Sequence, residues 1–272
     1  MVSSSTFNQF IFLNLITIFG LTSVVVSHDA FKLLYEPVPG YLDCSQDDPR
    51  LPEYTMKPCR GDTRNTGQTI TIACVGDSIT AGGWPQIMQS NLNVKYGANV
   101  YNVINFGECG STMQRHADSP YVNRTSWPIV LKTNATIIII MLGTNDAKTT
   151  ANNGPANWED NGKTGYDEYL MSYAWMVSQF NSMPSKPDVY VTTPVPNYIN
   201  GVYGMNQTVI NHIFPAKLPE IANELTKHLS LDIFDCMGGV NLTHPELIAD
   251  GCHPNAAGYI FLAQCFQTAL NL

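Results

Sequence analysis

The feature that most constrains the fold is a continuous apolar run at residues 135–142, ATIIIIML. Its four consecutive isoleucines are β-branched and favour an extended backbone. A strand that is apolar on both faces must be covered on both, as happens when helices pack on the two sides of a parallel sheet. Gly143-Thr144-Asn145-Asp146 follow the run directly. The run therefore predicts an α/β fold with polar residues at the end of a central strand.

Shorter apolar runs predict four further strands, at residues 69–75, 100–106, 189–193 and 231–234. Helical patterns lie between them at 84–96 and 166–180, and again at 206–229, where Pro215 and Pro219 should kink or divide the helix. Asn255 should cap a last helix that ends near residue 270. Alternating strands and helices imply right-handed crossovers. We predict a single-domain, flavodoxin-like three-layer α/β/α sandwich at 69–272, with a mostly parallel five-stranded sheet.

The first 27 residues carry no charged side chain, and residues 10–26 are mostly apolar. Val25 and Ser27 match the small-residue pattern that precedes a cleavage point, so 1–27 is predicted to be a signal peptide cleaved near His28. The usual basic n-region is missing, and an uncleaved signal anchor is the alternative, although about 17 residues is short for a bilayer. Residues 28–68 are predicted to form an irregular N-terminal extension, with a disordered linker as the alternative.

The apolar leader and the sequons predict a secreted or lumenal protein, and the composition predicts a weakly charged surface. Only 13% of residues are charged, against about 25% in typical soluble domains. Attached sugar could supply polarity, and N-glycosylation sequons begin at Asn123, Asn134, Asn206 and Asn241. The formal charge of −8 argues against a nucleic-acid partner and against a stable partnership with an anionic membrane. Oligomeric state is not indicated.

Seven cysteines in a secreted chain suggest disulfides and at least one free thiol. Proximity in sequence suggests Cys44 with Cys59 and Cys236 with Cys252, although connectivity cannot be deduced from sequence. Cys74 lies inside an apolar strand and is expected to be a buried free thiol. The chain has neither a CxxC pair nor Cys/His spacing typical of zinc, so no metal site is predicted.

Polar residues follow the predicted strands at 76–78 (GDS), 105–107 (NFG) and 143–146 (GTND), and a further set stands at 250–255 (DGCHPN). In a parallel sheet the strand ends share one edge, where open α/β sheets bind ligands. These groups should therefore converge on one cleft. A serine on such a strand-to-helix turn, here Ser78, is placed as a nucleophile needs. Taken alone, it could equally be a helix cap.

The four motifs together, GDSIT, NFGECG, GTND and DGCHPN in this order, resemble those of the SGNH, or GDSL-type, hydrolase family. The resemblance implies a serine esterase that needs no cofactor. Ser78 would be the nucleophile, His253 the general base, and Asp250 the group that orients His253. The oxyanion hole would consist of the Ser78 and Gly107 backbone N–H groups and the Asn145 side-chain amide. Isoleucine replaces the leucine that usually follows the serine, a conservative change.

Other polar residues near these motifs have plainer expected roles. Asp77 and Asp146 should hydrogen-bond backbone around the turns, and Glu108 could face either the site or solvent. Cys252 is a poor candidate nucleophile because its place in the motif is variable. The remaining histidines lack the partners of a triad and are expected to be structural or exposed: His28, His116, His212, His228 and His244.

Substrate is set by loops rather than by the fold. Trp158, after GTND, and Trp127, before the central strand, could stack on sugar rings, although ordinary packing is the commoner role. No long apolar lid offers a place for a fatty acyl chain. We therefore expect hydrolysis of short acyl esters, such as O-acetyl groups on carbohydrate. The alternatives are a lipid-directed esterase or lysophospholipase and a non-catalytic secreted glycan-binding protein.

Overall fold

The computed structural model describes residues 10–16, 21–27, 68–159 and 161–272, in two compact units that comprise 1–54 and 55–272. In the first unit, β1 (Phe10–Ile16) pairs antiparallel with β2 (Leu21–Ser27). Both strands fall within the predicted signal peptide, whose cleavage stays a prediction. The predicted extension, except for its last residue, and the predicted Cys44–Cys59 pair lie outside the described residues.

The second unit is built on a parallel sheet whose strand order is β4-β3-β5-β6. Its strands are β3 (Ile70–Gly76), β4 (Tyr101–Gly107), β5 (Ile137–Met141) and β6 (Asp188–Val191). The central strand β5 comes from the isoleucine run, and Ile138, Ile139 and Ile140 have no exposed surface. This confirms the predicted fold class and the burial of both faces of the run.

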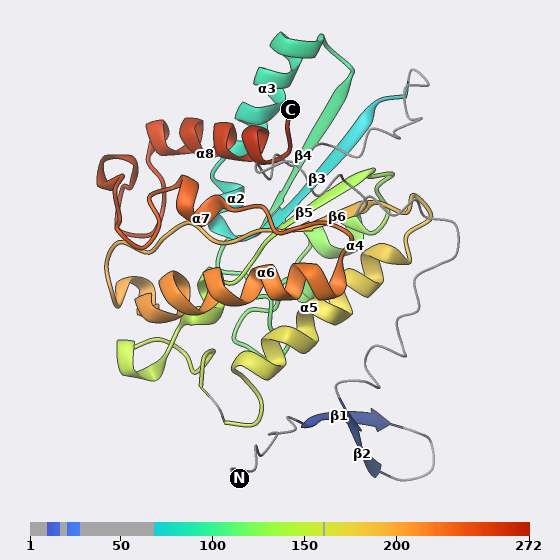
Figure 1. Ribbon diagram of the computed structural model, residues 1–272, viewed down its shortest axis with the longest axis vertical. Helices are drawn as coiled ribbons and strands as arrows, with labels where there is room; N and C mark the ends of the chain where they lie inside the picture. The colour runs from blue at the N-terminus through green and yellow to red at the C-terminus, as the bar shows by residue number, and fades with distance from the viewer. Residues whose placement is uncertain (1–9, 17–20, 28–67, 160) are drawn as a thin grey trace, which may run out of the picture. The chain divides into compact units, whose positions relative to one another are not determined.

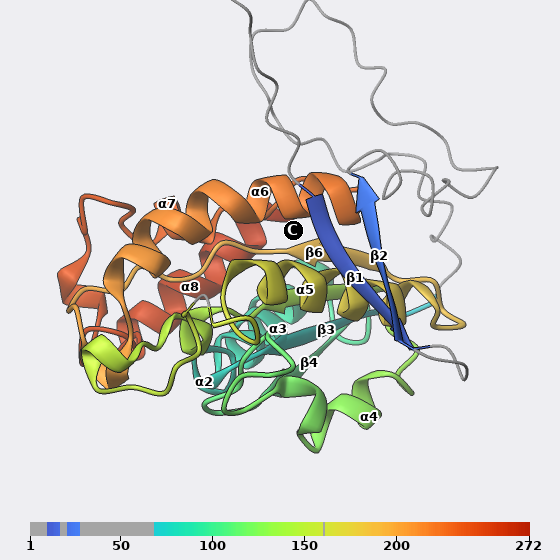
Figure 2. The ribbon, with the colours of Figure 1, turned by 90° about the horizontal axis from the view of Figure 1, so that it is seen from below.

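Helices cover both faces of the sheet, which Figure 1 shows running between two helix pairs. On one side α3 (Trp84–Tyr96) packs on α8 (Ala256–Ala269), where the rings of Trp84 and Phe266 stack 3.8 Å apart. On the other side α5 (Tyr166–Asn181) lies beside α6 (Phe214–Leu225), as Figure 2 also shows, and Tyr169 stacks on Phe214 at 4.9 Å. The sandwich is therefore three layers deep.

The bounds of α3, α5 and α8 agree with the sequence pattern. The aromatic stripe of α5 faces the core, and the Asn255 side chain caps α8 by accepting a hydrogen bond from the Gly258 N–H at 3.0 Å. The predicted helix at 206–229 is divided, with a π-helical segment, η5 (Val209–Ile213), leading into α6. Among the described residues, no helix is both long and apolar enough to cross a membrane.

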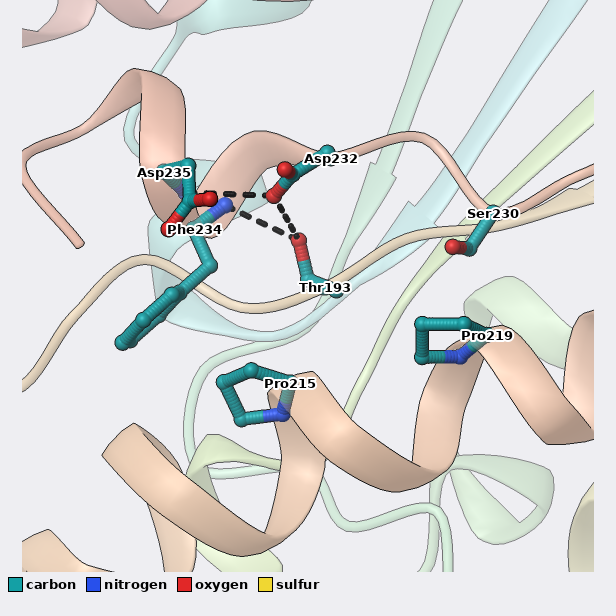
Figure 3. A pocket seen from close by; sticks show the side chains of 7 residues that line it. All are labelled: Thr193, Pro215, Pro219, Ser230, Asp232, Phe234 and Asp235. Carbon is teal, nitrogen blue, oxygen red and sulfur yellow. Dashed lines mark hydrogen bonds between the residues drawn. The ribbon is translucent and has the colours of Figure 1, made fainter. Parts of the chain in front are cut away.

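The predicted fifth strand at 231–234 is wrong, because the sheet has four strands. Leu231 makes one isolated parallel bridge with Thr192, and the chain then turns into the short helix α7 (Ile233–Cys236). Asp232 caps α7, and the Thr193 hydroxyl accepts hydrogen bonds from the Ile233 and Phe234 N–H groups at 2.9 Å each. These side chains accept the hydrogen bonds of backbone N–H groups that would otherwise pair with a neighbouring strand. Figure 3 shows them beside a cavity of about 160 Å³ bounded by Pro215 and Pro219.

The predicted disulfide between Cys236 and Cys252 is also wrong. Cys236 on α7 is bonded to Cys265 on α8, whereas Cys252 is a buried thiol whose Sγ lies 3.8 Å from the Met205 Sδ. Nearness in sequence was misleading because α8 brings Cys265 back beside α7. Cys74 is a buried free thiol, as expected.

Short helical segments complete the connections: α2 (Ser78–Ala81), η1 (Tyr121–Asn123), α4 (Ser126–Val130), η2 (Thr144–Ala147), η3 (Thr150–Asn152), η4 (Val202–Gly204) and η6 (Pro245–Leu247). Of these, α2 directly follows β3, η2 closely follows β5, and η4 lies in the connection after β6. They therefore carry the residues that lie beyond the carboxyl edge of the sheet.

Candidate active site

Ser78 lies where β3 gives way to α2. The cap of this helix is Asp77, whose carboxylate accepts a hydrogen bond from the Ile79 N–H at 2.9 Å. Ser78 is therefore the first residue of the helix rather than its cap, which removes the alternative role suggested by sequence. Its side chain is partly exposed between the buried Asp77 and Ile79. The serine hydroxyl is thus available at the carboxyl edge of the sheet.

The loop before α8 brings His253 to this serine. Its Nε2 lies 2.9 Å from the Ser78 Oγ, and its Nδ1 lies 2.8 Å from the Asp250 Oδ2. The loop closes on itself through a hydrogen bond from the Ala249 N–H to the His253 carbonyl at 2.8 Å. Gly251 turns the chain with a φ of +92°, a backbone conformation that residues with a side chain rarely adopt. This turn places Asp250 and His253 on the same side, as the D-x-x-H spacing predicts.

The Asp250 carboxylate is held in its ionised form. Burial opposes ionisation, but this effect is outweighed by hydrogen bonds from the backbone N–H groups of His253 (2.7 Å) and Cys252 (2.9 Å), and from the His253 and Tyr203 side chains. Together they lower the pKa of Asp250 well below its usual range. A carboxylate that stays charged can hold the His253 ring and stabilise it when it gains a proton.

The predicted oxyanion donors lie at the ends of three strands. No described residue accepts a hydrogen bond from the Ser78 N–H. The Asn145 side chain is buried, and its Nδ2 lies 3.5 Å from the Asp77 Oδ2, a long contact. The Gly107 N–H donates instead to the Asn105 Oδ1 at 2.8 Å. Glycine is required at 107, since a Cβ there would lie 2.1 Å from the Ala81 backbone nitrogen in α2.

Two buried carboxyl groups support these turns. Asp77 caps α2, and Asp146 accepts hydrogen bonds from the Met113 and Gln114 N–H groups at 2.8 Å each, joining η2 to the chain beyond β4. Burial raises the pKa of Asp77 to about 6 and that of Asp146 to about 7. Both make the backbone contacts that we expected of them.

Residues 74–260 match the sequence profile of the family described as GDSL-like Lipase/Acylhydrolase. The match covers more than half of the chain. The chain belongs to the GDSL-like lipase/acylhydrolase family. This confirms the resemblance drawn from the four motifs, and the family is one of carboxylic ester hydrolases. The match includes Ser78, Asp250 and His253.

This GDSL-like hydrolase is 28% identical over 223 residues to an acetylxylan esterase from Xylanibacter ruminicola. That alignment covers 74% of the present chain but only 43% of the relative. Among solved structures, an α/β hydrolase from the metagenome of Lake Arreo, Spain, superposes with a TM-score of 0.57 at 18% identity, covering 75% of this chain and 96% of that one. At these identities the structural likeness shows the fold alone.

A two-domain esterase active on acetylated mannans is also similar in structure, with a TM-score of 0.51 and 18% identity. The superposition covers 75% of this chain and 49% of that one. The GDSL-like hydrolase thus spans about half the length of this esterase, and somewhat less of the acetylxylan esterase.

The two tryptophans singled out in the hydrolase sequence pack on other aromatic rings. Trp158 contacts Tyr169 and Phe214 edge to face, at 5.5 and 5.1 Å between ring centroids. Trp127 lies on α4 against Trp175 and Phe180, both at 5.5 Å. Each ring keeps part of its surface exposed. Packing against these aromatic rings is therefore the observed role of both tryptophans.

Glu108 and Cys252 also have structural surroundings. The Glu108 carboxylate accepts hydrogen bonds from the Ser126 N–H and from the hydroxyls of Ser126 and Thr125, so it supports the start of α4. Hydrogen bonds from Ser126 are the main cause of its lowered pKa. Burial raises the pKa of the Cys252 thiol, which opposes formation of a thiolate nucleophile. Asn123, Asn134 and Asn241 are exposed and Asn206 is half-buried.

Three other histidines have carboxylate partners that sequence did not reveal. His116 lies 2.9 Å from Glu168, while His228 and His244 lie 3.3 Å from Asp188 and Glu246. None of these pairs includes a serine placed as Ser78 is, so they are polar contacts of the scaffold. In the ranges the structure describes, no cluster of three or more His, Cys, Asp or Glu side chains could hold a metal ion.

Sequence reasoning missed Tyr203, whose hydroxyl donates to the Asp250 Oδ2 at 2.8 Å. Its ring also stands edge-on to the His253 ring, 5.4 Å away and at 72°. The available signal was the run Gly201-Val-Tyr-Gly204, in which two glycines mark a tight turn after the fourth strand. That signal locates a turn but does not say what it faces.

Proposed function

We propose that this protein is a serine esterase in which Ser78, His253 and Asp250 form the catalytic triad. The observation that carries the proposal is the chain of contacts from Ser78 Oγ through both His253 ring nitrogens to Asp250 Oδ2, at 2.9 and 2.8 Å. Such an arrangement lets histidine remove the serine proton as the oxygen attacks an ester carbonyl.

In the proposed reaction, Ser78 Oγ forms a bond to the acyl carbon while its proton passes to His253 Nε2. The tetrahedral intermediate collapses, the bond to the alcohol oxygen breaks, and His253 protonates the leaving alcohol. A water molecule then attacks the acyl carbon while the same histidine takes its proton. As this second tetrahedral intermediate collapses, the bond from the acyl carbon to Ser78 Oγ breaks, His253 returns the proton to Oγ, and the acid leaves. Asp250 holds Nδ1 throughout and stabilises the imidazolium that forms twice in each turnover.

The oxyanion would receive hydrogen bonds from the Ser78 N–H and the Asn145 Nδ2. To bind the oxyanion, the Asn145 Nδ2 would lose only its long 3.5 Å hydrogen bond to the Asp77 Oδ2. We keep Gly107 as the third donor. Its N–H now bonds the neutral Asn105 amide oxygen, and a negatively charged oxyanion is a stronger acceptor that would compete for it.

We propose O-acetyl groups on carbohydrate as the substrate class. Two similar proteins support this choice, one named as an acetylxylan esterase and one as active on acetylated mannans. Both proteins are longer than this chain and contain regions that it does not match, so their sugars are not carried over to it. The sugar that bears the acetyl group is to be found by experiment. The positions of Trp158 and Trp127 give no independent support, since their rings are used in packing.

The experiment is to express the full chain in a secretory host and compare hydrolysis of p-nitrophenyl acetate, butyrate and octanoate. We expect acetate to be cleaved best, and acetylated xylan and mannan to release acetate. Preference for octanoate would contradict the carbohydrate proposal and favour a lipid esterase. If folded protein cleaves none of the esters, binding to glycans should be measured instead.

We also propose that the chain enters the secretory pathway and is cleaved near His28. Its uncharged, apolar N-terminus and its four sequons support this, and three of the four sequon asparagines are exposed. N-terminal sequencing of the secreted product and its mass before and after enzymatic deglycosylation test the proposal. A product that begins at Met1, or that carries no sugar, would contradict the corresponding part.

A further inference from the structure

Tyr203 contacts both members of the acid–base pair. Its hydroxyl donates to the Asp250 Oδ2, the same oxygen that accepts from His253 Nδ1. The edge of its ring faces the ring of His253. The other Asp250 oxygen is held by two backbone N–H groups, so Tyr203 adds a second donor to the oxygen that binds histidine.

The backbone of Tyr203 is in a conformation that is unusual for a residue with a side chain. Its φ is +53° and its ψ is +24°, in the left-handed region where glycine is favoured. The residue is also 56% exposed, so burial of the ring does little to offset the strain. Strain of this kind persists where the surrounding structure enforces it, and it clusters at functional sites.

The turn that carries Tyr203 is held on two sides. Within it, the Gly201 N–H donates to the Met205 carbonyl at 2.9 Å and the Gly204 N–H donates to the Gly201 carbonyl at 3.0 Å. The Gly204 carbonyl accepts from the Thr149 N–H at 3.0 Å, and Lys148 forms a bridge with Met205. The loop that follows GTND therefore fixes this turn, and the turn fixes the position of Tyr203.

We propose that Tyr203 is a positioning residue for the triad, which keeps Asp250 Oδ2 directed at His253 Nδ1. Asp250 needs such support because 35% of its side chain is exposed, and water could otherwise compete with histidine for its oxygen. The inference rests on the proposed esterase function. In this proposal, the loops after β5 and β6 set the geometry of the Asp250–His253 pair, which lies in the loop before α8.

The first test is Tyr203→Phe, which removes the hydroxyl and keeps the ring. We expect kcat for p-nitrophenyl acetate to fall about tenfold while KM stays within about twofold, because a hydrogen bond to a charged group that orients the base is lost. Tyr96→Phe, at a partly exposed tyrosine on α3, is the matched control and should leave both constants unchanged. An unchanged kcat in Tyr203→Phe would overturn the proposal.

The second test is Tyr203→Gly, which relieves the backbone strain. A tyrosine kept for stability would lower the melting temperature when removed, whereas a positioning residue lowers kcat with little thermal cost. We expect a melting temperature within about 3 °C of the wild-type value and a loss of kcat at least as large as in Tyr203→Phe. Lys186→Gly, which relieves a similar φ of +48° at an exposed turn, is the control and should keep full activity.

Labelling with a fluorophosphonate probe separates this inference from the proposed function. We expect the wild-type chain to be labelled at Ser78 and Tyr203→Phe to be labelled about tenfold more slowly. A wild-type chain that is neither labelled nor active would contradict the esterase proposal itself. Normal labelling and turnover in both Tyr203 variants would contradict only the positioning role.

Discussion

The Ser78 Oγ and His253 Nε2 atoms lie 2.9 Å apart, although 175 positions separate the two residues in the chain. One follows the first strand of the sheet and the other precedes the last helix. The packing of α3 on α8 helps to bring these distant segments together, since α3 follows Ser78 and α8 follows His253. The Ser78–His253 contact therefore depends on the completed sandwich.

Removing the serine hydroxyl should abolish turnover. We expect Ser78→Ala to lower kcat by at least about 10⁴-fold, because only the weak catalysis due to substrate binding and the oxyanion donors would remain. Steady-state hydrolysis of p-nitrophenyl acetate and titration of the acyl-enzyme burst measure this. Circular dichroism and the melting temperature should match the wild type. Substantial residual activity in a folded variant would mean that another residue is the nucleophile.

Asn145→Ala tests the oxyanion hole. Losing one preorganised donor should lower kcat by about 10²- to 10³-fold with a small change in KM, since the donor acts mainly when charge develops on the oxygen. Asn93→Ala, at an exposed position on α3, is the control and should leave kcat unchanged. A large rise in KM without a loss of kcat would instead place Asn145 in substrate binding.

The Cys236–Cys265 bond should contribute substantially to stability. It closes a loop with a sequence separation of 29, for which chain-entropy estimates give about 3–4 kcal/mol. The double variant Cys236→Ala with Cys265→Ala should unfold at a lower urea concentration, and its free energy of unfolding should be about 3–4 kcal/mol smaller than that of the wild type. Cys252→Ala should keep the bond, and peptide mapping without reduction should find it. Finding Cys236 linked to Cys252 would contradict the assignment.

Asp146 should make stability depend on pH in a defined direction. Burial raises its pKa from 3.8 to about 7, so between these values the folded chain binds more protons than the unfolded one. The folded state is therefore stabilised relative to the unfolded state by the protonated Asp146. This stabilisation is fully present below pH 3.8, and it is lost as the pH rises through about 7. Asp77, with a pKa raised to about 6, acts in the same direction. Asp250 acts oppositely, but only at lower pH, because its pKa is lowered.

Urea unfolding near pH 5 and near pH 8 measures this dependence. In Asp146→Asn the loss of stability between the two conditions should be smaller than in the wild type, because the group no longer titrates. Asp167→Asn, at an exposed site on α5, should behave as the wild type does. An unchanged pH dependence in Asp146→Asn would show that Asp146 is not responsible.

Several features of the fold and site followed from sequence because their causes are local. The isoleucine run of β5, the aromatic stripe of α5 and the Asn255 cap of α8 each express the preferences of neighbouring residues. The predictions that failed concerned contacts between segments. Residues 231–234 read as a strand, yet the Thr193 hydroxyl, from another element, takes the N–H groups that a strand would use.

By itself, the sequence determined the class of fold, the order of the motifs and the identity of the candidate triad, since periodicity, turn residues and short motifs are properties of contiguous residues. Only the tertiary structure decided that Cys236 pairs with Cys265, that Asn105 occupies the Gly107 N–H, and that Tyr203 holds Asp250. The disulfide and the Tyr203 contact join residues far apart in the chain, and the Asn105 amide that faces Gly107 is itself held by hydrogen bonds to the Thr80 carbonyl and the Gln86 side chain. Which partner each group takes depends on distances that exist only once the helices have packed on the sheet.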